Sequence, residues 1–408
     1  MLIKNILMEL RSRLRSCNVY ITAGVNLNKD CNLKINIQSD CIVLNYYGES
    51  CSRRNSLSSI DSLTDYSDEE CEDYSYIPIH EFCHIIPNSM SCLKIDKNTI
   101  SFRILTEPKN GGNFYTEFLS ANNLTNNLKN NLKINLDAGS DVRIICGNCS
   151  NVISNDWVKF DRILELPTTN LDMSEWFCHG HCHGESSQPV LNPNKNDFLY
   201  RLTYFVINNN LLAEKTNKFN SKRDIYHCNR CLAWLGLKTK NNVKLYNSEV
   251  KIQTSDISVQ VFTHNNQTNS VSIDDFIHTI ECLTRESNLG VQYSVMCKLI
   301  LECSISSTSK QYLLVWVMDK ELQVLRNVDQ IESERVTLQS SLLTKVLYKV
   351  ESSLNEEVET WLSDPAVVST DISKNMFYRG MEHLQAISQK VPEAFRTTNG
   401  YSISYLKM

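Results

Sequence analysis

The chain has 408 residues, a formal net charge of -5, 21% charged residues and 42% hydrophobic residues, which is typical of an ordinary folded protein. The slight acidic excess gives no electrostatic support for direct binding to DNA or RNA. The first residues lack the long apolar segment of a signal peptide, and no run approaches the ~18 apolar residues of a membrane helix. We therefore expect a cytoplasmic and nuclear protein without direct nucleic-acid or membrane binding.

The N-terminal part of the sequence is predicted to be rich in antiparallel strands. Apolar residues alternate with polar ones in several short segments, as they do in half-buried strands. These segments are residues 18–22, 33–37, 41–47, 81–86 and 99–105. Residues 49–76 are instead rich in Ser, Asp and Glu and have few apolar side chains, so we expect a disordered surface insertion. It is either a plain solvated loop or a segment regulated by serine phosphorylation.

The rest of the chain mixes strand and helix patterns, which predicts an α+β fold. Strands are expected at residues 141–145, 250–254, 257–263, 292–305, 311–318, 321–326 and 401–408. Helices are expected at 272–283 and from Ser369 or Thr370 to Gln389, and the Asn-rich stretch 122–131 reads as a loop. We predict three domains: a β-rich domain at 1–145, a central zinc-knuckle module at 146–240 and a C-terminal α+β domain at 241–408.

Two C-x-x-C turns are the most specific chemical feature of the sequence. Two thiolates at positions i and i+3 can bind one ion from a tight turn, so Cys146 and Cys149 with Cys228 and Cys231 would complete a tetrahedral zinc site. The 16 cysteines lie in a long chain with no signal peptide, which favours reduced or metal-bound thiols over disulfides.

The separation of the two turns leaves alternatives open. Cys149 and Cys228 lie 79 positions apart, far more than the ~15–20 residues of a compact zinc finger. Loop closure costs only ~0.6 kcal/mol per doubling of length, whereas a structural zinc contributes on the order of 10 kcal/mol. We predict a structural zinc held by all four cysteines, with mixed ligation or no metal as the alternatives.

A second group of soft ligands lies between the turns, at Cys178, His179, His181, Cys182 and His183. One reading is a buried cysteine and a hydrogen-bonded histidine anchored by Trp176. A second is a nucleophilic thiol with its base. The third is a thiolate that is offered to the metal of another protein.

The order of the motifs along the chain resembles the HECT-like ubiquitin ligases, also called ubiquitin-conjugating-enzyme-binding proteins. The matching motifs are Cys146-x-x-Cys149, Leu164-x-Leu-Pro167, Glu175-Trp-x-Cys-His179, His227-Cys-x-x-Cys-x-x-x-Leu-Gly236, Tyr312-Leu-Leu-Val-Trp-Val-Met-Asp319, Val346-Leu-Tyr348 and Tyr405-Leu-Lys-Met408. They cover nearly the whole chain, interrupted by the acidic insertion and the Asn-rich loop.

The resemblance implies two functions. The first is a ubiquitin ligase that binds a ubiquitin-conjugating enzyme and ubiquitin, with cyclin B among its proposed substrates. The second is a binding protein for the zinc-dependent endonuclease subunit of pre-mRNA cleavage. In that role Glu175, Trp176, Cys178 and His179 would enter the nuclease active site, with Cys178 on its zinc and Trp176 as an anchor. His181, Cys182 and His183 are secondary metal candidates.

The sequence departs from the family pattern in one respect. HECT-type transfer needs a cysteine near the C-terminus, but the matching stretch reads Ser373-Lys-Asn-Met376 and no cysteine follows Cys303. A thioether cannot form a thioester, so the catalytic residue is unknown and enzyme activity is uncertain. Ligase, nuclease-binding protein and zinc-stabilised scaffold all remain open.

Overall fold

The computed structural model describes residues 3–24, 26–27, 32–47, 73–109, 133–166, 193–213, 225–238, 241–255, 257–263, 271–287, 296–306, 309–328 and 335–408. The chain divides into two compact units, each built from segments that are distant in the sequence. Unit 1 comprises Met1–Lys129, Asp319–Lys345 and Ile387–Lys407; unit 2 comprises Asn130–Met318, Val346–Ala386 and Met408. No described helix combines the length and apolar character that a membrane crossing needs.

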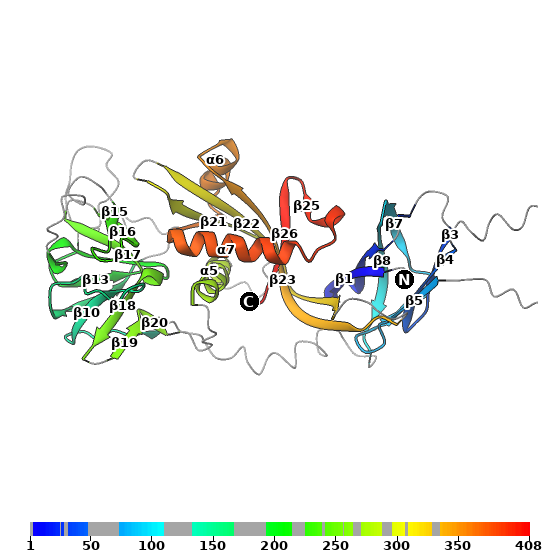
Figure 1. Cartoon of the computed structure of the whole chain (residues 1–408), viewed down its shortest axis with the longest axis horizontal. Helices are drawn as coiled ribbons and strands as arrows, with labels where there is room; N and C mark the ends of the chain where they lie inside the picture. The colour runs from blue at the N-terminus through cyan, green and yellow to red at the C-terminus, as the bar shows by residue number, and fades with distance from the viewer. Residues whose placement is uncertain are drawn as a thin grey trace, which may run out of the picture. The chain divides into compact units, whose positions relative to one another are not determined.

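Unit 1 is built from antiparallel strands. Its strands are β1 (Ile3–Arg11), β2 (Ser16–Ala23), β3 (Asn32–Ile37), β4 (Cys41–Tyr47), β5 (Asp73–Pro78), β6 (His84–Ile85), β7 (Ser91–Asp96), β8 (Thr99–Glu107), β25 (Thr397–Thr398) and β26 (Tyr401–Leu406). Strand β1 pairs with β2, and β2 with β8, while β3, β4 and β5 form a separate sheet (Figure 1). Buried aliphatic side chains from both sheets form one hydrophobic core.

A buried carboxylate ties the two ends of the chain together inside unit 1. The side chain of Glu9 is fully buried and accepts hydrogen bonds from Lys345 Nζ and the Tyr405 hydroxyl, each at 2.7 Å. Asn18 Nδ2 donates a third at 3.2 Å. Burial alone would raise the pKa of Glu9, but the charge and hydrogen bond of Lys345 outweigh it, and the pKa falls below its usual value.

Unit 2 contains the remaining strands and the three described helices. The strands are β9 (Lys133–Ile134), β10 (Asp141–Cys146), β11 (Val158–Lys159), β12 (Arg162–Glu165), β13 (Asp197–Tyr200), β14 (Tyr204–Asn208), β15 (Ile225–His227), β16 (Trp234–Lys238), β17 (Asn242–Tyr246), β18 (Val250–Thr254), β19 (Ile257–Gln260), β20 (Phe262–Thr263), β21 (Cys297–Ser304) and β24 (Val368–Asp371). The helices are α5 (Val271–Ser287), α6 (Glu356–Ser363) and α7 (Lys374–Ser388).

Two sheets of unit 2 share one core. A six-stranded sheet has the order β12-β13-β14-β17-β16-β15, and a four-stranded sheet has the order β11-β10-β18-β19. Side chains of both sheets, including Phe160, Phe198 and Phe205, pack in one buried cluster. Cys146 and Cys228 belong to the same cluster, so the two cysteine turns project from a single packed body.

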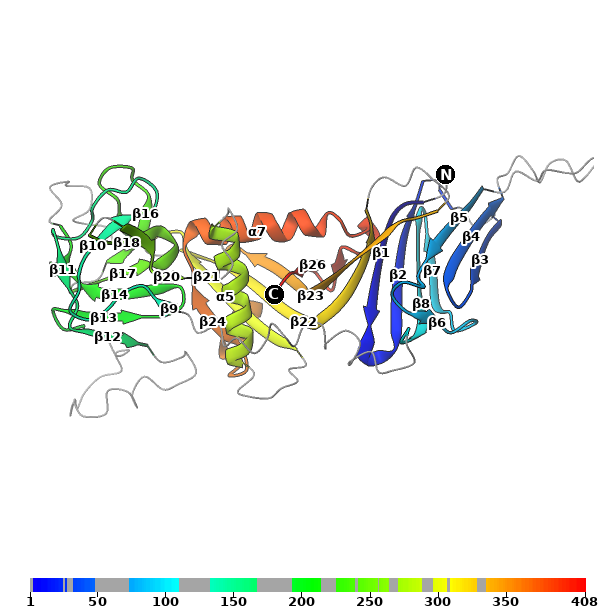
Figure 2. The same ribbon diagram turned by 90° about the horizontal axis from the view of Figure 1, so that it is seen from below.

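Helix α5 packs on strands β21 and β24, and helix α6 contacts β21. Figure 2 shows α5 lying across β21 and β24 with α7 beside it. The two helices approach closely where Gly380 of α7 faces the Phe276 ring of α5. A Cβ at position 380 would lie 2.3 Å from that ring, so any side chain there would push the helices apart.

The two longest strands, β22 (Lys310–Asn327) and β23 (Leu338–Glu351), contribute residues to both units. The two units are interleaved in the sequence because these strands pass from one to the other. The three domains expected from the sequence stay a prediction. The α+β class agrees with a β-rich structure that has three described helices.

Several predicted elements are confirmed and some need correction. Most N-terminal strands and the helix at 272–283 are present. The two strands expected at 311–318 and 321–326 are one strand, β22, because the charged residues between them remain extended. The strand expected at 81–86 is reduced to His84–Ile85, since residues 80–83 form a turn. The end of the insertion expected at 49–76 is instead a strand, because β5 begins at Asp73 and pairs with β4. Residues 49–72 lie outside the described residues.

The last helix begins later than expected. Residues 368–371 form β24, which pairs in parallel with β21. The helix starts at Lys374, because the Ser373 hydroxyl caps it by accepting a hydrogen bond from the Met376 backbone N–H at 3.1 Å. The Asn-rich stretch 122–131 lies outside the described residues.

Candidate metal centre

Two equivalent turns carry the four cysteines. Cys146 is the last residue of β10, and Cys228 directly follows β15. In each turn the backbone N–H after the second cysteine donates to the carbonyl of the first, from Ser150 to Cys146 at 2.9 Å and from Leu232 to Cys228 at 3.1 Å. Ser150 and Leu232 both have positive φ angles, of 57° and 61°. The repeated geometry is that of a knuckle that presents two sulfurs to one point.

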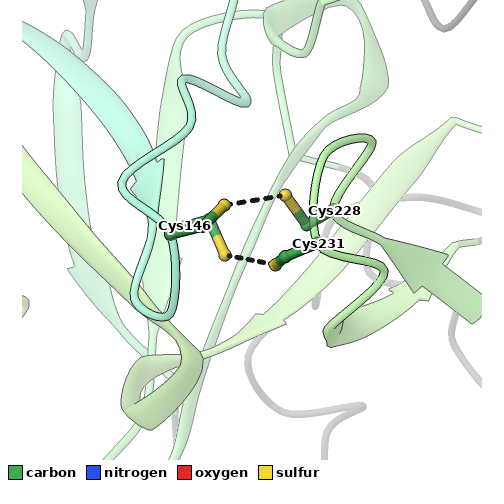
Figure 3. A group of neighbouring side chains, drawn as sticks. Cys146, Cys228 and Cys231 are labelled. Atoms are coloured by element: carbon green, nitrogen blue, oxygen red, sulfur yellow. Dashed lines mark hydrogen bonds between the residues drawn. The ribbon is translucent and has the colours of Figure 1, made fainter.

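The four sulfurs converge in the way that a metal ion requires. Cys146 Sγ lies 3.6 Å from Cys231 Sγ (Figure 3). Cys149 Sγ lies 3.6 Å from Cys228 Sγ. All four lie within 4.8 Å of one another. A tetrahedral zinc with Zn–S bonds of about 2.3 Å separates its sulfurs by about 3.8 Å. The predicted cysteines therefore form a cluster whose spacing fits one four-coordinate ion.

The environment of the sulfurs is divided between core and surface. Cys146 and Cys228 are buried, while Cys149 and Cys231 are partly exposed. Burial raises the pKa of Cys146 to about 12. Burial acts on Cys231 in the same direction, but hydrogen bonds from the Ala233 backbone and the Asn148 side chain outweigh it and lower its pKa to about 6. Metal binding must therefore displace a proton from the buried Cys146 thiol.

Close backbone contacts hold the first knuckle in place. The Gly147 N–H donates to the Glu249 carbonyl at 2.8 Å. A Cβ at position 147 would lie 2.9 Å from that oxygen, so glycine is needed for this approach. In the second knuckle His227 Nδ1 lies 3.1 Å from the Leu232 carbonyl, which makes this ring a support of the turn. No local sequence pattern marks Gly147, Glu249 or the His227 ring as supports of the site.

Buried polar contacts fasten the strand before α7 to the knuckle sheet within unit 2. Asp371 accepts from Lys244 Nζ at 2.6 Å and from the Tyr246 hydroxyl at 3.2 Å. The Asp371 carbonyl accepts from the Thr203 hydroxyl at 2.9 Å. Burial, together with the Asp371 charge, raises the pKa of Tyr246, so its hydroxyl stays protonated as a donor.

A cavity of about 510 Å³ lies between the knuckles and α7. Its lining residues are Asn148, Ala233, Trp234, Glu249, Lys374, Asn375, Tyr378, Arg379 and Glu382. Glu249 accepts a hydrogen bond from the Ser373 hydroxyl at 2.8 Å, and burial raises its pKa. No sequence motif links these residues, because they come from both knuckles, a turn and a helix.

The second group of soft ligands lies outside the described residues, together with the two residues that precede it. These residues are Glu175, Trp176, Cys178, His179, His181, Cys182 and His183. Within the described part of the chain, the metal-binding cluster consists of the four knuckle cysteines. Because all four positions of a tetrahedral ion would be filled by protein ligands, such a centre has a structural role and no open position for substrate.

Comparison with known proteins gives one family. The model of the HECT-like ubiquitin-conjugating enzyme (E2)-binding family matches residues 9–403. No curated protein and no solved structure matches the chain.

Proposed function

Because this chain belongs to the HECT-like ubiquitin-conjugating enzyme (E2)-binding family, we propose that it binds an E2 and directs ubiquitin from it to substrates as a HECT-like ubiquitin-protein ligase. The observation that carries this proposal is the family match over residues 9–403, which includes both knuckles and the helices. Cyclin B as a substrate and residence in cytoplasm and nucleus are parts of the same proposal.

The ion in the knuckle cluster is zinc in this proposal. Four thiolates at tetrahedral spacing form a donor set that zinc prefers, and a closed site suits a structural ion. Its role is to keep the two knuckles in fixed positions on the shared core. Metal analysis of the purified protein tests this assignment directly.

The E2 docks, in this proposal, on the surface formed by the second knuckle and the adjoining cavity. Leu232 at the tip of that knuckle is 71% exposed and is held in a left-handed backbone conformation. The cavity beside it offers the Trp234 and Tyr378 rings together with the charges of Lys374 and Arg379. An exposed leucine beside aromatic and basic side chains has the composition of a protein-binding surface.

Binding measurements with a panel of E2 enzymes test the docking surface. Leu232→Ser should reduce the affinity for the E2 that binds by about tenfold. This factor corresponds to the ~1.4 kcal/mol typical of one apolar contact residue. Leu354→Ser is the matched control, because Leu354 is also an exposed leucine of unit 2, 51% exposed, but lies outside the knuckles and the cavity. The wild type should also accelerate loss of ubiquitin from the charged E2.

Two results would count against these proposals. If no E2 of the panel binds the wild-type protein, the ligase function fails. If an E2 binds and Leu232→Ser and Leu354→Ser leave its affinity unchanged, binding stands but the docking surface lies elsewhere.

One observation favours the second candidate function, a non-catalytic protein that inhibits or chaperones the pre-mRNA 3'-end endonuclease. The stretch Ser373-Lys-Asn-Met376, which the resemblance matches to a cysteine-containing stretch of some family members, holds no cysteine, and Met376 is buried at 3% exposure in the first turn of α7. In this candidate the Trp176-Cys178-His179 segment binds the nuclease zinc. Cys178→Ala should then abolish binding to the nuclease, and unchanged binding would reject this candidate.

A further inference from the structure

A histidine, a glutamate and a cysteine lie close together on one face of α5. Cys282 Sγ lies 3.3 Å from His278 Nε2, and His278 Nδ1 lies 3.6 Å from Glu281 Oε2. The first distance is a hydrogen bond between thiol and ring, and the second is an ion-pair distance. Spacings of three and four residues place these side chains on one helix face. The order thiol, imidazole, carboxylate is that of an activated nucleophile with an oriented base.

The carboxylate of this group remains ionised. The contact with His278 is the main cause that lowers the pKa of Glu281, and it outweighs the opposing effect of burial. Arg285, one turn further along α5, also pairs with Glu281. An ionised Glu281 favours the ring tautomer that carries its proton on Nδ1. Nε2 then carries no proton and can accept the thiol proton of Cys282 across their 3.3 Å contact.

The group is accessible as well as ordered. Cys282 is partly exposed, and the side chain of His278 is 15% exposed. His278 also borders a cavity of about 30 Å³, whose wall includes Asn247. Asn247 Oδ1 is a buried acceptor that finds no hydrogen-bond partner among the described residues. A cavity of this size accommodates about one water molecule.

The other described cysteines are placed differently. Cys17, Cys41, Cys83, Cys297 and Cys303 are buried. Burial raises the pKa of Cys83 and of Cys303 to about 12, which disfavours their thiolates. The knuckle cysteines are committed to the metal cluster, and Cys92 is exposed on a strand of unit 1. Among the described cysteines, Cys282 combines a histidine contact with access to solvent.

We propose that Cys282 is the residue that accepts ubiquitin from the bound E2 as a thioester, with His278 as base and Glu281 as the positioning residue. This inference rests on the proposed E2-binding function. It supplies the acceptor thiol that the C-terminal stretch around Met376 lacks.

The transfer step balances without any further reactant. The Cys282 thiol proton moves to His278 Nε2 while the sulfur attacks the carbonyl carbon of the E2–ubiquitin thioester. The bond between that carbon and the E2 sulfur breaks, and a new thioester forms on Cys282. The departing E2 thiolate takes the proton from His278. One thioester is consumed and one is formed, so no oxidant or nucleotide is needed at this step.

Alkylation of the wild-type protein provides the first test, because it requires neither an E2 nor a variant. The full chain is treated with limiting iodoacetamide at pH 7, and labelling of each cysteine is followed by peptide mass spectrometry. Cys92 is the internal control, being more exposed but outside this group. An ordinary cysteine is only a few per cent thiolate at pH 7, so we expect Cys282 to react about tenfold faster than Cys92. Equal or slower labelling of Cys282 overturns the proposal.

Variants then test the roles of the two partners. His278→Gln should reduce labelling of Cys282 to the rate of Cys92 and leave Cys92 itself unchanged. Glu281→Ala should slow labelling, whereas Glu281→Gln, which keeps an acceptor oxygen for the ring, should restore part of it. A loss of rate in Glu281→Gln equal to that in Glu281→Ala rejects the positioning role. Zinc content and thermal midpoint report whether each variant is folded.

Ubiquitin transfer is the final test. A charged E2 that binds the protein should yield a ubiquitin adduct that dithiothreitol cleaves. The adduct should be absent in Cys282→Ala, present in Cys92→Ser, and resistant to dithiothreitol but cleaved by hydroxide in Cys282→Ser. If an E2 binds but the adduct persists in Cys282→Ala or never forms, Cys282 is not the acceptor, while the E2-binding function stands. If no E2 binds, the proposed function fails, and the acceptor role of Cys282 fails with it.

Discussion

Replacement of one knuckle cysteine gives the sharpest test of the structure. In Cys228→Ser the hydroxyl takes the place of a buried thiol, and the sulfur that lies 3.6 Å from Cys149 Sγ is lost. A neutral hydroxyl does not replace a thiolate ligand, so the cluster retains three of its four sulfurs. We expect the bound ion to leave.

The size of the effect follows from the chain between the knuckles. Bringing together two points 79 positions apart costs about 4.5 kcal/mol in loop entropy. A structural zinc contributes on the order of 10 kcal/mol at neutral pH, which is more than enough to offset that cost. Its loss therefore removes at least ~5 kcal/mol, comparable with the whole stability of many domains. At ~2–4 °C per kcal/mol for a unit of this size, the thermal midpoint should fall by at least ~10 °C.

The measurement combines metal content with thermal unfolding. Plasma mass spectrometry should find about one zinc per wild-type chain and almost none in Cys228→Ser. Near-ultraviolet circular dichroism should record the lower midpoint of the variant. Cys303→Ser is the matched control, because Cys303 is also a fully buried cysteine of unit 2 but lies outside the cluster. It should keep its zinc.

The reasoning would be refuted by a Cys228→Ser variant that retains one zinc and unfolds within about 2 °C of the wild type. An equal loss of zinc in Cys303→Ser would also refute it, because the loss would then reflect general unfolding. Either result would mean that the four sulfurs do not hold an ion that stabilises unit 2.

Three further predictions concern the packing around the site and the buried carboxylate. Gly236→Ala places a Cβ 1.9 Å from the Lys244 carbonyl, so it should disrupt the pairing of β16 with β17 and lower the free energy of unfolding by ~3 kcal/mol in urea titrations. Asp371→Ala leaves the partly buried Lys244 ammonium and the buried Tyr246 hydroxyl without this partner and should cost ~1–3 kcal/mol by the same measurement. The pKa of Glu9 is below its usual 4.5, so its contribution to stability is complete above about pH 4.5 and is lost as the pH falls further. In Glu9→Gln the free energy of unfolding should be lower than in the wild type at pH 7 and should fall less between pH 7 and pH 3. An unchanged pH dependence would contradict this assignment.

The sequence predicted those parts of the site that local chemistry defines. The four knuckle cysteines could be identified because C-x-x-C spacing reflects the geometry of one tight turn, whatever the length of chain between the turns. The strands with alternating burial, such as β2, could be identified for a similar reason. Both signals are complete within a few residues.

The remaining features depend on contacts between distant segments, which no local pattern encodes. The cavity beside the knuckles is assembled from Asn148, Trp234, Glu249 and the first turns of α7. Residues 368–371 were expected to begin the last helix, but pairing with β21 makes them a strand. The group on α5 has helical spacings of three and four residues, which can be read from the sequence. These spacings give no distinct signal, because His278, Glu281 and Cys282 resemble ordinary positions of an amphipathic helix.

The Glu9 contacts have a consequence for how the protein is made. Glu9 leaves the ribosome well before its partner Tyr405, which lies 396 positions further along the chain. Until Tyr405 has been synthesised, the N-terminal strands therefore carry a carboxylate that lacks one of its hydrogen-bond donors. A nonsense mutation between Lys345 and Tyr405 should thus leave an N-terminal half that quality-control chaperones recognise.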